Sequence, residues 1–195
     1  MALRVIGGKL RGRKLRSVKG YQTRPTADRI RESLFDILST RVAGSVVLDL
    51  FAGTGALGIE AISRGAESAV FVDIEPRALR IIQENLAAFS LQRQTQCIRW
   101  DVVKNLDCLR SCSQVFDLVL MDPPYNMSMI VPCLSNLRRS GCLKPNAWIV
   151  VEHSSLEPVL ERPAPFSLFD QRRYGKTLVS FLINMISSTN CAGRC

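Results

Sequence analysis

One stretch constrains the fold more than any other, and it is residues 46–62, VVLDLFAGTGALGIEAI. An apolar segment leads into Gly53, Gly55 and Gly58, which match the spacing G-x-G-x-x-G, and a helix-like segment follows. A strand, a glycine turn and a helix in this order predict a nucleotide-bearing cofactor held at the turn. Taken alone, residues 53–58, GTGALG, suggest a dehydrogenase. The rest of the chain must therefore identify the cofactor.

The chain after residue 45 alternates short apolar segments with helix-like segments, which is typical of a parallel sheet flanked by helices. The expected strands cover residues 45–50, 68–73, 95–100, 116–122 and 147–153. The expected helices cover about 56–64, 76–90, 104–111, 128–140 and 155–161. Residues 165–183 form two further β-like segments joined across Tyr174 and Gly175, which predicts a hairpin with an antiparallel edge. We therefore predict a doubly wound α/β fold with a mostly parallel sheet.

Positive charge is concentrated at the start of the chain. The whole sequence carries a net charge of +9, and residues 1–31 alone hold ten Lys and Arg residues against one acid, Asp28. This one-sided charge predicts a polyanionic partner, although a basic surface that only contacts water is the plain alternative. The side chains that we expect to bind nucleic-acid phosphates are Arg11, Arg13, Lys14, Arg24, Arg29 and Arg31.

We divide the chain into three parts. Residues 1–40 form a basic N-terminal extension, with a small hairpin from segments 4–8 and 12–18 and a helix from about 26 to 39. Residues 41–184 form the main domain, and residues 185–195 form a flexible tail.

Acidic side chains lie at or near the ends of the expected strands, where parallel sheets bind their ligands. Asp73 ends the second strand and is well placed to accept hydrogen bonds from ribose hydroxyls, which does not separate NAD from other adenosine cofactors. The other acids at these positions are Asp49, Asp101, Asp122 and Glu152.

The segment FDLVLMDPPYN separates the possible cofactors. Pro123 and Pro124 stiffen the turn that follows the fourth strand, and this turn would hold Asp122 beside the aromatic face of Tyr125. A flipped base with an exocyclic amine needs such a site, because an acceptor binds the amine and a ring stacks on the base. We therefore assign Asp122, Pro123, Pro124 and Tyr125 to the catalytic site.

The seven cysteines and the single histidine, His153, do not form the usual spacing of a zinc site, so we expect no metal and mostly buried, reduced thiols. No apolar stretch approaches the ~20 residues that span a bilayer, and the N-terminus has no secretory signal. An organellar presequence would also be rich in Arg, but the motifs begin as early as Arg4. We expect a monomeric, cytoplasmic protein with no membrane contact.

The motifs resemble those of a known family. The segment VVLDLFAGTGALGIEAISRGA looks like the first motif of class I S-adenosylmethionine methyltransferases, which have a Rossmann-like sheet, and DPPYN resembles their motif for methylating exocyclic amines. With RVIGGKLRGRKL and TRPTADRIRESLFDIL, the chain resembles the RsmD-type bacterial 16S ribosomal RNA guanine-N2 methyltransferases from about residue 4 to residue 183.

This resemblance implies a role for each motif. It implies that Gly53, Gly55 and the Phe51 backbone lie near the methionine part of S-adenosylmethionine, with Asp49 just ahead of them. It further implies that Asp73 binds the ribose, Asp101 the adenine amine, and residues 122–125 the target guanine. The implied partner is 16S ribosomal RNA, either naked or within an assembling small subunit.

Three other functions stay open. A DNA amino-methyltransferase would also use D-P-P-Y, and only the N-terminal resemblance argues against it. A dehydrogenase would use the same glycines but leave D-P-P-Y without a role. A non-catalytic RNA-binding module would explain the basic extension but not the acidic strand ends.

Overall fold

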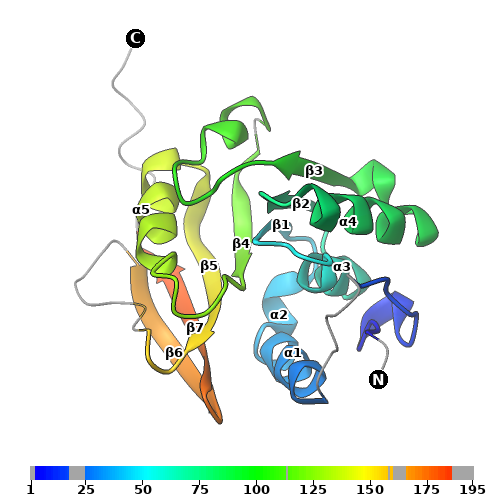
Figure 1. Ribbon diagram of the computed structural model, residues 1–195, viewed down its shortest axis with the longest axis horizontal. Coiled ribbons are helices and arrows are strands. Elements are labelled where there is room, and N and C mark those ends of the chain that lie inside the picture. Colours follow the sequence, from blue (N-terminus) through cyan, green and yellow to red (C-terminus); the bar gives the residue numbers. More distant parts are fainter. Residues whose placement is uncertain (1–2, 18–24, 113, 158, 160–165, 186–195) are drawn as a thin grey trace.

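The computed structural model describes residues 3–17, 25–112, 114–157, 159 and 166–185. Its central feature is a seven-stranded sheet in the order β3-β2-β1-β4-β5-β7-β6 (Figure 1). The strands are β1 Val46–Leu50, β2 Ser68–Asp73, β3 Thr95–Arg99, β4 Phe116–Met121, β5 Leu143–Ser154, β6 Phe166–Tyr174 and β7 Thr177–Asn184. Strands β1 to β5 pair in parallel, while β7 pairs antiparallel with both β5 and β6. The predicted mixed α/β sheet with a C-terminal antiparallel hairpin is confirmed.

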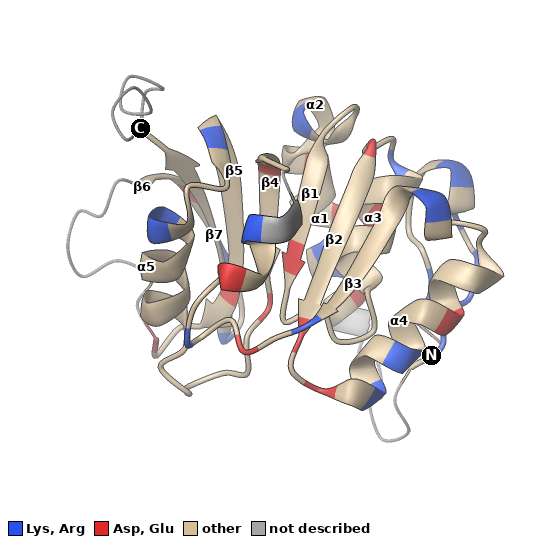
Figure 2. Ribbon diagram, turned by 90° about the horizontal axis from the view of Figure 1, so that it is seen from above, with Lys and Arg blue, Asp and Glu red and all other residues tan. Residues whose placement is uncertain are grey.

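Helices cover both faces of the sheet (Figures 1 and 2). They are α1 Pro25–Ile37, α2 Ser39–Val42, α3 Ala56–Ser63, α4 Pro76–Ala88 and α5 Ile130–Ser140. Residues of α1, α3 and α4 share one apolar cluster with alternate residues of the strands, whereas α5 packs in a second cluster on the opposite face. Central strands that are buried on both faces carry apolar residues almost without interruption, which explains the continuous run VVLDL in β1.

The N-terminal segment is packed against the sheet domain. Its predicted hairpin is reduced to a single antiparallel bridge between Arg4 and Lys14, with a 3-10 helix at Gly8–Leu10 between them. Leu3, Val5 and Leu10 are buried in the same apolar cluster as α1, α3 and α4. The extension and the sheet therefore share one core. Arg24 and most of the predicted tail lie outside the described residues.

Two predicted helices differ from the structure. A short 3-10 helix, Asp107–Cys112, takes the place of the helix expected at 104–111, because the side chain of Asn105 accepts the backbone N–H of Asp107 at 3.0 Å and starts a tight turn. The described residues of segment 155–161 form a turn, and Pro158 disfavours helical geometry at the residue before it. Neither difference affects the edge where β1 to β4 end, and this edge carries the candidate site.

Candidate active site

The glycine turn after β1 has an unusual backbone. Phe51 and Gly53 both have a φ of 57°, and Gly55 has a φ of 76° at the N-cap of α3. Left-handed geometry costs a non-glycine residue on the order of 1–3 kcal/mol, so its presence at Phe51 is typical of a functional turn. An added Cβ at Gly53 would meet only the Phe51 carbonyl oxygen at 3.8 Å, which leaves room for a ligand to approach the backbone.

Asp73, at the end of β2, supports this turn. Its Oδ2 accepts the backbone N–H of Gly53 at 2.8 Å, and its Oδ1 accepts that of Glu75 at 2.8 Å. A carboxylate has about four acceptor positions, so these two bonds leave capacity for the hydroxyl groups of a ribose. Asp73 is half-buried beside the exposed side chain of Ile74, which adds an apolar surface next to the acceptor.

Asp49 lies beneath the turn. It is 1% exposed, and its Oδ2 accepts the backbone N–H of Gly58 at 2.9 Å. Burial raises the pKa of Asp49 to about 8, the Gly58 bond opposes this shift, and the charge of Asp73 adds to it. A Cβ at Gly58 would lie 2.4 Å from Phe71, so this glycine is needed for close packing. Asp49 therefore shapes the turn from inside the protein.

Asp101 follows β3 at the same edge of the sheet. Its Oδ1 accepts the backbone N–H of Val103 at 3.1 Å, and its Oδ2 lies 3.8 Å from Nζ of Lys104. The side chain is half-buried, so its carboxylate can accept a hydrogen bond from the exocyclic amine of a ligand at this edge. The order of the sheet places β3 at its edge, with β2 and β1 between it and β4.

The loop after β4 presents Tyr125 to solvent. The residue is 40% exposed, and its hydroxyl donates a hydrogen bond of 2.8 Å to Oε1 of Glu152 and lies 3.2 Å from Oγ1 of Thr177. The backbone N–H of Asn126 donates to Oε2 of Glu157 at 2.8 Å. These contacts hold the loop against β5 and β7, so the ring of Tyr125 is fixed at its hydroxyl end.

Two carboxyl groups meet beside this loop. The pKa of Asp122 is raised well above its ordinary value, first because dense protein surroundings disfavour the charged form, and then because Glu152 and Asp49 carry like charges. Asp122 is nevertheless open to solvent on one side, which moderates this effect. Burial also raises the pKa of Glu152, while the Tyr125 hydroxyl and the charge of Arg31 act in the opposite direction.

Arg31 has a different place from the one expected. Its side chain is buried, donates to the Arg4 carbonyl oxygen at 2.7 Å and to Asp28 at 3.0 Å, and lies 3.9 Å from the buried carboxylate of Glu60. Burial lowers its pKa, and Glu60 and Asp28 oppose this. The expectation that Arg31 binds phosphate is therefore wrong for the folded protein, since the guanidinium faces inward. The sequence could not show this, because the partners lie on three separate elements.

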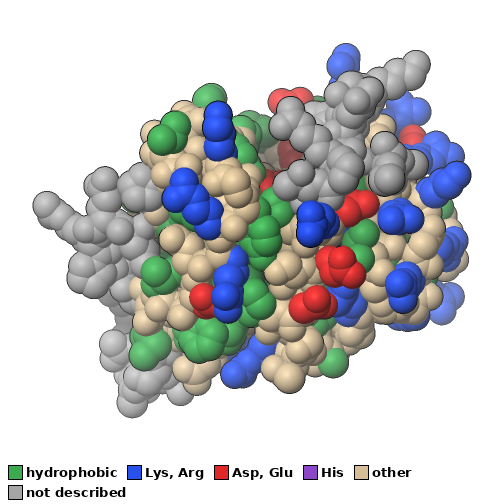
Figure 3. Space-filling model, turned by 90° about the horizontal axis from the view of Figure 1, so that it is seen from below, with side chains coloured by type: hydrophobic (Ala, Val, Ile, Leu, Met, Phe, Trp, Pro, Cys, Tyr) green, Lys and Arg blue, Asp and Glu red, His purple; other side chains and the backbone are tan. Residues whose placement is uncertain are grey.

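The other described basic candidates are exposed. Arg11 and Arg29, together with Arg4, line a surface pocket of about 320 Å³ between the N-terminal segment and α1. Arg13 lies 4.3 Å over the ring of Phe89 and donates to the Ala88 carbonyl oxygen, while Lys14 is exposed nearby. Figure 3 shows Lys and Arg side chains gathered toward the right of one face of the molecule, with acidic side chains among them.

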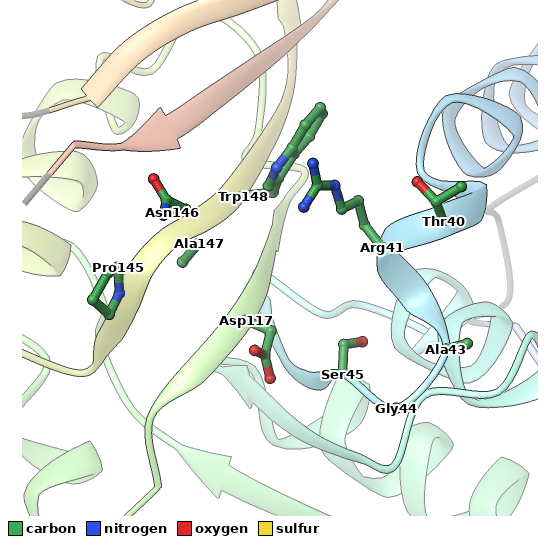
Figure 4. A pocket seen from close by; sticks show the side chains of 10 residues that line it. All are labelled: Thr40, Arg41, Ala43, Gly44, Ser45, Asp117, Pro145, Asn146, Ala147 and Trp148. Atoms are coloured by element: carbon green, nitrogen blue, oxygen red, sulfur yellow. The ribbon is translucent and has the colours of Figure 1, made fainter. Parts of the chain in front are cut away.

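A second pocket, of about 280 Å³, lies at the opposite edge of the sheet, where β1 and β4 begin (Figure 4). Arg41 points toward the ring of Trp148 there, 5.4 Å from its centroid. The pocket contains none of the predicted site residues. Among the described residues no group of three or more His, Cys, Asp or Glu is arranged to hold a metal ion, and no described helix could cross a membrane.

The residues at the carboxyl edge fit an adenosyl cofactor. Gly53 leaves space for close backbone approach, Asp73 retains acceptor positions for a ribose, and Asp101 can accept from an amine. The predicted D-P-P-Y residues follow β4, the neighbour of β1. They contribute the exposed ring of Tyr125 and the carboxylate of Asp122 at the same edge. The sequence identified Glu152 only as an acid at a strand end. Its hydrogen bond to Tyr125 is seen only in the structure.

The doubly wound sheet, the glycine turn and the D-P-P-Y loop define a class I S-adenosylmethionine-dependent methyltransferase. The chain belongs to the family described as conserved hypothetical protein 95, whose family model matches residues 3–183.

Relatives with assigned names support this class. The YlbH protein of Bacillus subtilis is 34% identical over 178 residues, which cover 91% of this chain and 97% of that one. The ribosomal RNA small subunit methyltransferase D of Haemophilus influenzae is 34% identical over 176 residues, covering 89% of each chain. The structure of the Escherichia coli protein yhhF superimposes with a TM-score of 0.80 at 29% identity, covering 96% of this chain and all of that one.

Proposed function

We propose that this protein methylates the exocyclic N2 amine of one guanine in 16S ribosomal RNA, with S-adenosylmethionine as the methyl donor. The observation that carries this proposal is the placement of Asp122 and the exposed ring of Tyr125 at the same sheet edge as the glycine turn. The name of the Haemophilus relative, a small-subunit ribosomal RNA methyltransferase, supports the substrate class.

The cofactor site consists of the turn and two carboxylates. Backbone groups of Phe51, Gly53 and Gly55 would hold the methionine part, Asp73 the ribose and Asp101 the adenine amine. When bound, S-adenosylmethionine supplies a sulfonium methyl group that a nitrogen nucleophile can attack. Asp49 keeps the turn in shape through Gly58.

The loop after β4 prepares the guanine. Its N2 amine is a poor nucleophile because the lone pair is delocalised into the ring. Asp122 and the carbonyl oxygen of Pro123 accept the two amine hydrogens, which localises the lone pair, and Tyr125 fixes the plane of the base. Such positioning contributes on the order of 7–11 kcal/mol in well-oriented reactions.

The exposed cations of the N-terminal extension bind the RNA backbone. Phosphate contacts orient the substrate without identifying its bases, and the planar guanidinium suits phosphate oxygens. We propose Arg11, Arg13, Lys14 and Arg29 for this role among the described residues, with Arg24 retained from the sequence. The protein would act as a monomer in the cytoplasm, where ribosomal subunits assemble.

Methyl transfer to defined substrates tests the proposal. The protein is incubated with methyl-labelled S-adenosylmethionine and with ribosomal RNA or small-subunit particles from cells that lack it, and the methylated base is then mapped. We expect label at N2 of one guanine in 16S RNA. Label on adenine or cytosine, or preferential methylation of duplex DNA, would contradict the proposal. Binding of NAD in preference to S-adenosylhomocysteine would contradict the cofactor assignment.

A further inference from the structure

Glu152 lies beside Asp122 at the candidate catalytic site. Strands β4 and β5 are parallel, and their register pairs Leu120 with Val150 and Met121 with Val151. The next position along this register pairs Asp122 with Glu152. Neighbouring strands are about 4.8 Å apart, and residues in register point to the same face of the sheet. The two carboxyl groups are therefore neighbours on the face that α1 covers.

The contacts of Glu152 leave part of its carboxylate available. Oε1 accepts a hydrogen bond of 2.8 Å from the hydroxyl group of Tyr125. Within the described part of the chain, Oε2 makes no hydrogen bond. Burial raises the pKa of Glu152, while the Tyr125 hydrogen bond and the charge of Arg31 on α1 oppose that rise. The site thus presents two acceptors side by side, one of them fixed against an aromatic ring.

Two adjacent carboxylates need adjacent donors. Like charges at this separation repel each other, and a ligand that donates an N–H to each of them relieves the repulsion. The Watson–Crick edge of guanine presents the ring N1–H beside the N2 amine, so it offers both donors in one plane. Adenine N1 and cytosine N3 are acceptors at the corresponding ring positions, and their lone pairs would face a carboxylate.

From this juxtaposition we infer that Glu152 is a specificity-determining residue, which accepts the N1–H of the target guanine while Asp122 accepts its N2 amine. The inference rests on the proposed function and deepens it. It gives Glu152 two tasks, since the same carboxylate holds the Tyr125 ring through Oε1 and recognises the base through Oε2. A site that hydrogen-bonds a particular N–H rejects analogues that lack it, because its own acceptor is then left unpaired.

A base analogue separates these tasks. 2-Aminopurine keeps the 2-amino group of guanine but has an unprotonated N1, so it offers no donor to Glu152. Synthetic RNA is prepared with the mapped target as guanine or as 2-aminopurine, and kcat/KM for methyl transfer is measured with the wild type and with Glu152→Gln. Dividing the wild-type preference by the preference of the variant cancels the different intrinsic reactivity of the two amines.

Glu152→Gln is a matched change, because the amide oxygen can still accept the Tyr125 hydroxyl while the amide N–H can donate to an unprotonated N1. We expect the preference for guanine to fall by about tenfold to a hundredfold in this variant, the usual worth of one good base contact. Tyr125→Phe should lower kcat/KM for both RNAs and keep the wild-type preference for guanine. Glu67→Gln removes an exposed carboxylate near the opposite edge of the sheet, and it should change neither kcat/KM nor the preference for guanine.

The outcomes distinguish the inference from the proposed function. If the wild type transfers no methyl group to guanine N2, the proposed function is wrong. If it methylates guanine but Glu152→Gln keeps the wild-type preference, only the inference is wrong. A competition assay uses the wild type alone: RNA with inosine at the target keeps N1–H, RNA with unsubstituted purine lacks it, and both lack the amine, so the inosine RNA should inhibit the wild type better. Equal inhibition by the two RNAs would overturn the inference.

Discussion

Asn85 Nδ2 donates a hydrogen bond of 3.0 Å to the carbonyl oxygen of Thr54, which joins helix α4 to the glycine turn. The same side chain accepts the backbone N–H of Arg16 at 2.7 Å and donates to the Arg16 carbonyl oxygen at 3.1 Å. Asn85 is almost fully buried, and its three hydrogen bonds are partly shielded from water. One amide therefore connects the basic N-terminal segment to the proposed cofactor turn.

Substitution of Asn85 should lower both the stability of the protein and its affinity for the cofactor. In Asn85→Ala the part-buried backbone groups of Thr54 and Arg16 lose their partner, which costs on the order of 1 kcal/mol of unfolding free energy. Asn85→Asp should cost more, because it places a carboxylate against two carbonyl oxygens. Urea denaturation and S-adenosylhomocysteine titration measure the two effects. An Ala variant with wild-type stability and affinity would show that the connection is unimportant.

Asp122→Ala should lower turnover strongly and leave the cofactor site intact. Asp122 is exposed and follows the end of β4, so its loss leaves the core unchanged. Loss of one preorganised partner of the reacting group typically lowers kcat by about 100-fold to 1,000-fold. S-adenosylhomocysteine affinity should stay close to that of the Glu67→Gln control. Full activity in Asp122→Ala would remove this residue from the mechanism.

The N-terminal cations should control the salt dependence of RNA binding. Deletion of the segment is unsuitable as a test, because Leu3, Val5 and Leu10 belong to the core. The double variant Arg11→Ala/Lys14→Ala removes two exposed charges and should lower the slope of log K against log salt by about 1–2. The matched control Arg93→Ala/Arg110→Ala removes two exposed charges from the sheet domain. Equal slopes in the two double variants would contradict the assignment.

Glu60 should be the main electrostatic support of the N-terminal segment. Its buried carboxylate accepts the backbone N–H groups of Ile6 and Gly7 at 2.8 and 2.7 Å and pairs with Arg64 at 2.8 Å. Glu60→Ala leaves the buried Arg31, the half-buried Arg64 and two backbone N–H groups without this partner, so we expect a loss of about 3–5 kcal/mol in unfolding free energy. Chemical denaturation measures this loss, with Glu67→Ala as the control. A loss below about 1 kcal/mol would contradict the role of Glu60, because an exposed ion pair contributes about that much.

Asp49 should make the protein less stable as pH rises. The pKa of this carboxyl is about 8 in the native protein, against an ordinary value of 3.8, because burial disfavours the charge. Between these values the native protein holds a proton that the unfolded chain has lost. Its contribution to the unfolding free energy is therefore complete below about pH 4 and is lost progressively up to about pH 8. Asp49→Asn should remove this slope in urea titrations at pH 5 and pH 8, and an unchanged slope would refute the assignment.

Local patterns predicted most of the sheet. The alternation of apolar segments placed β2 at 68–73, as observed, because a strand buried on both faces has clear apolar limits. Strand β5 begins at Leu143, four residues before the prediction, since Lys144, Pro145 and Asn146 interrupt the apolar pattern. The antiparallel pairing of β5 with β7 depends on contacts distant in sequence, and no local pattern indicates it.

The candidate site was predictable only in part. Asp73 and the D-P-P-Y residues were identified from their positions at strand ends, and the structure brings them to one edge. The partners of these residues were not identified, because a hydrogen bond such as Tyr125 to Glu152 joins a loop residue to a β5 residue that lies 27 positions away in the sequence. Arg31 shows the opposite error, since charge composition cannot distinguish an exposed cation from one that is buried with Asp28 and Glu60.

The position of β7 has a consequence for the synthesis of the protein. This strand, Thr177–Asn184, covers the free edge of β5 and follows the other six described strands along the chain. Until it leaves the ribosome, β5 has one unpaired edge, and exposed edges of apolar strands favour association with other chains. Glu152 pairs with Val179 in this last strand. A nascent chain that stops before residue 177 would therefore contain every predicted catalytic residue and still lack the support that positions Glu152.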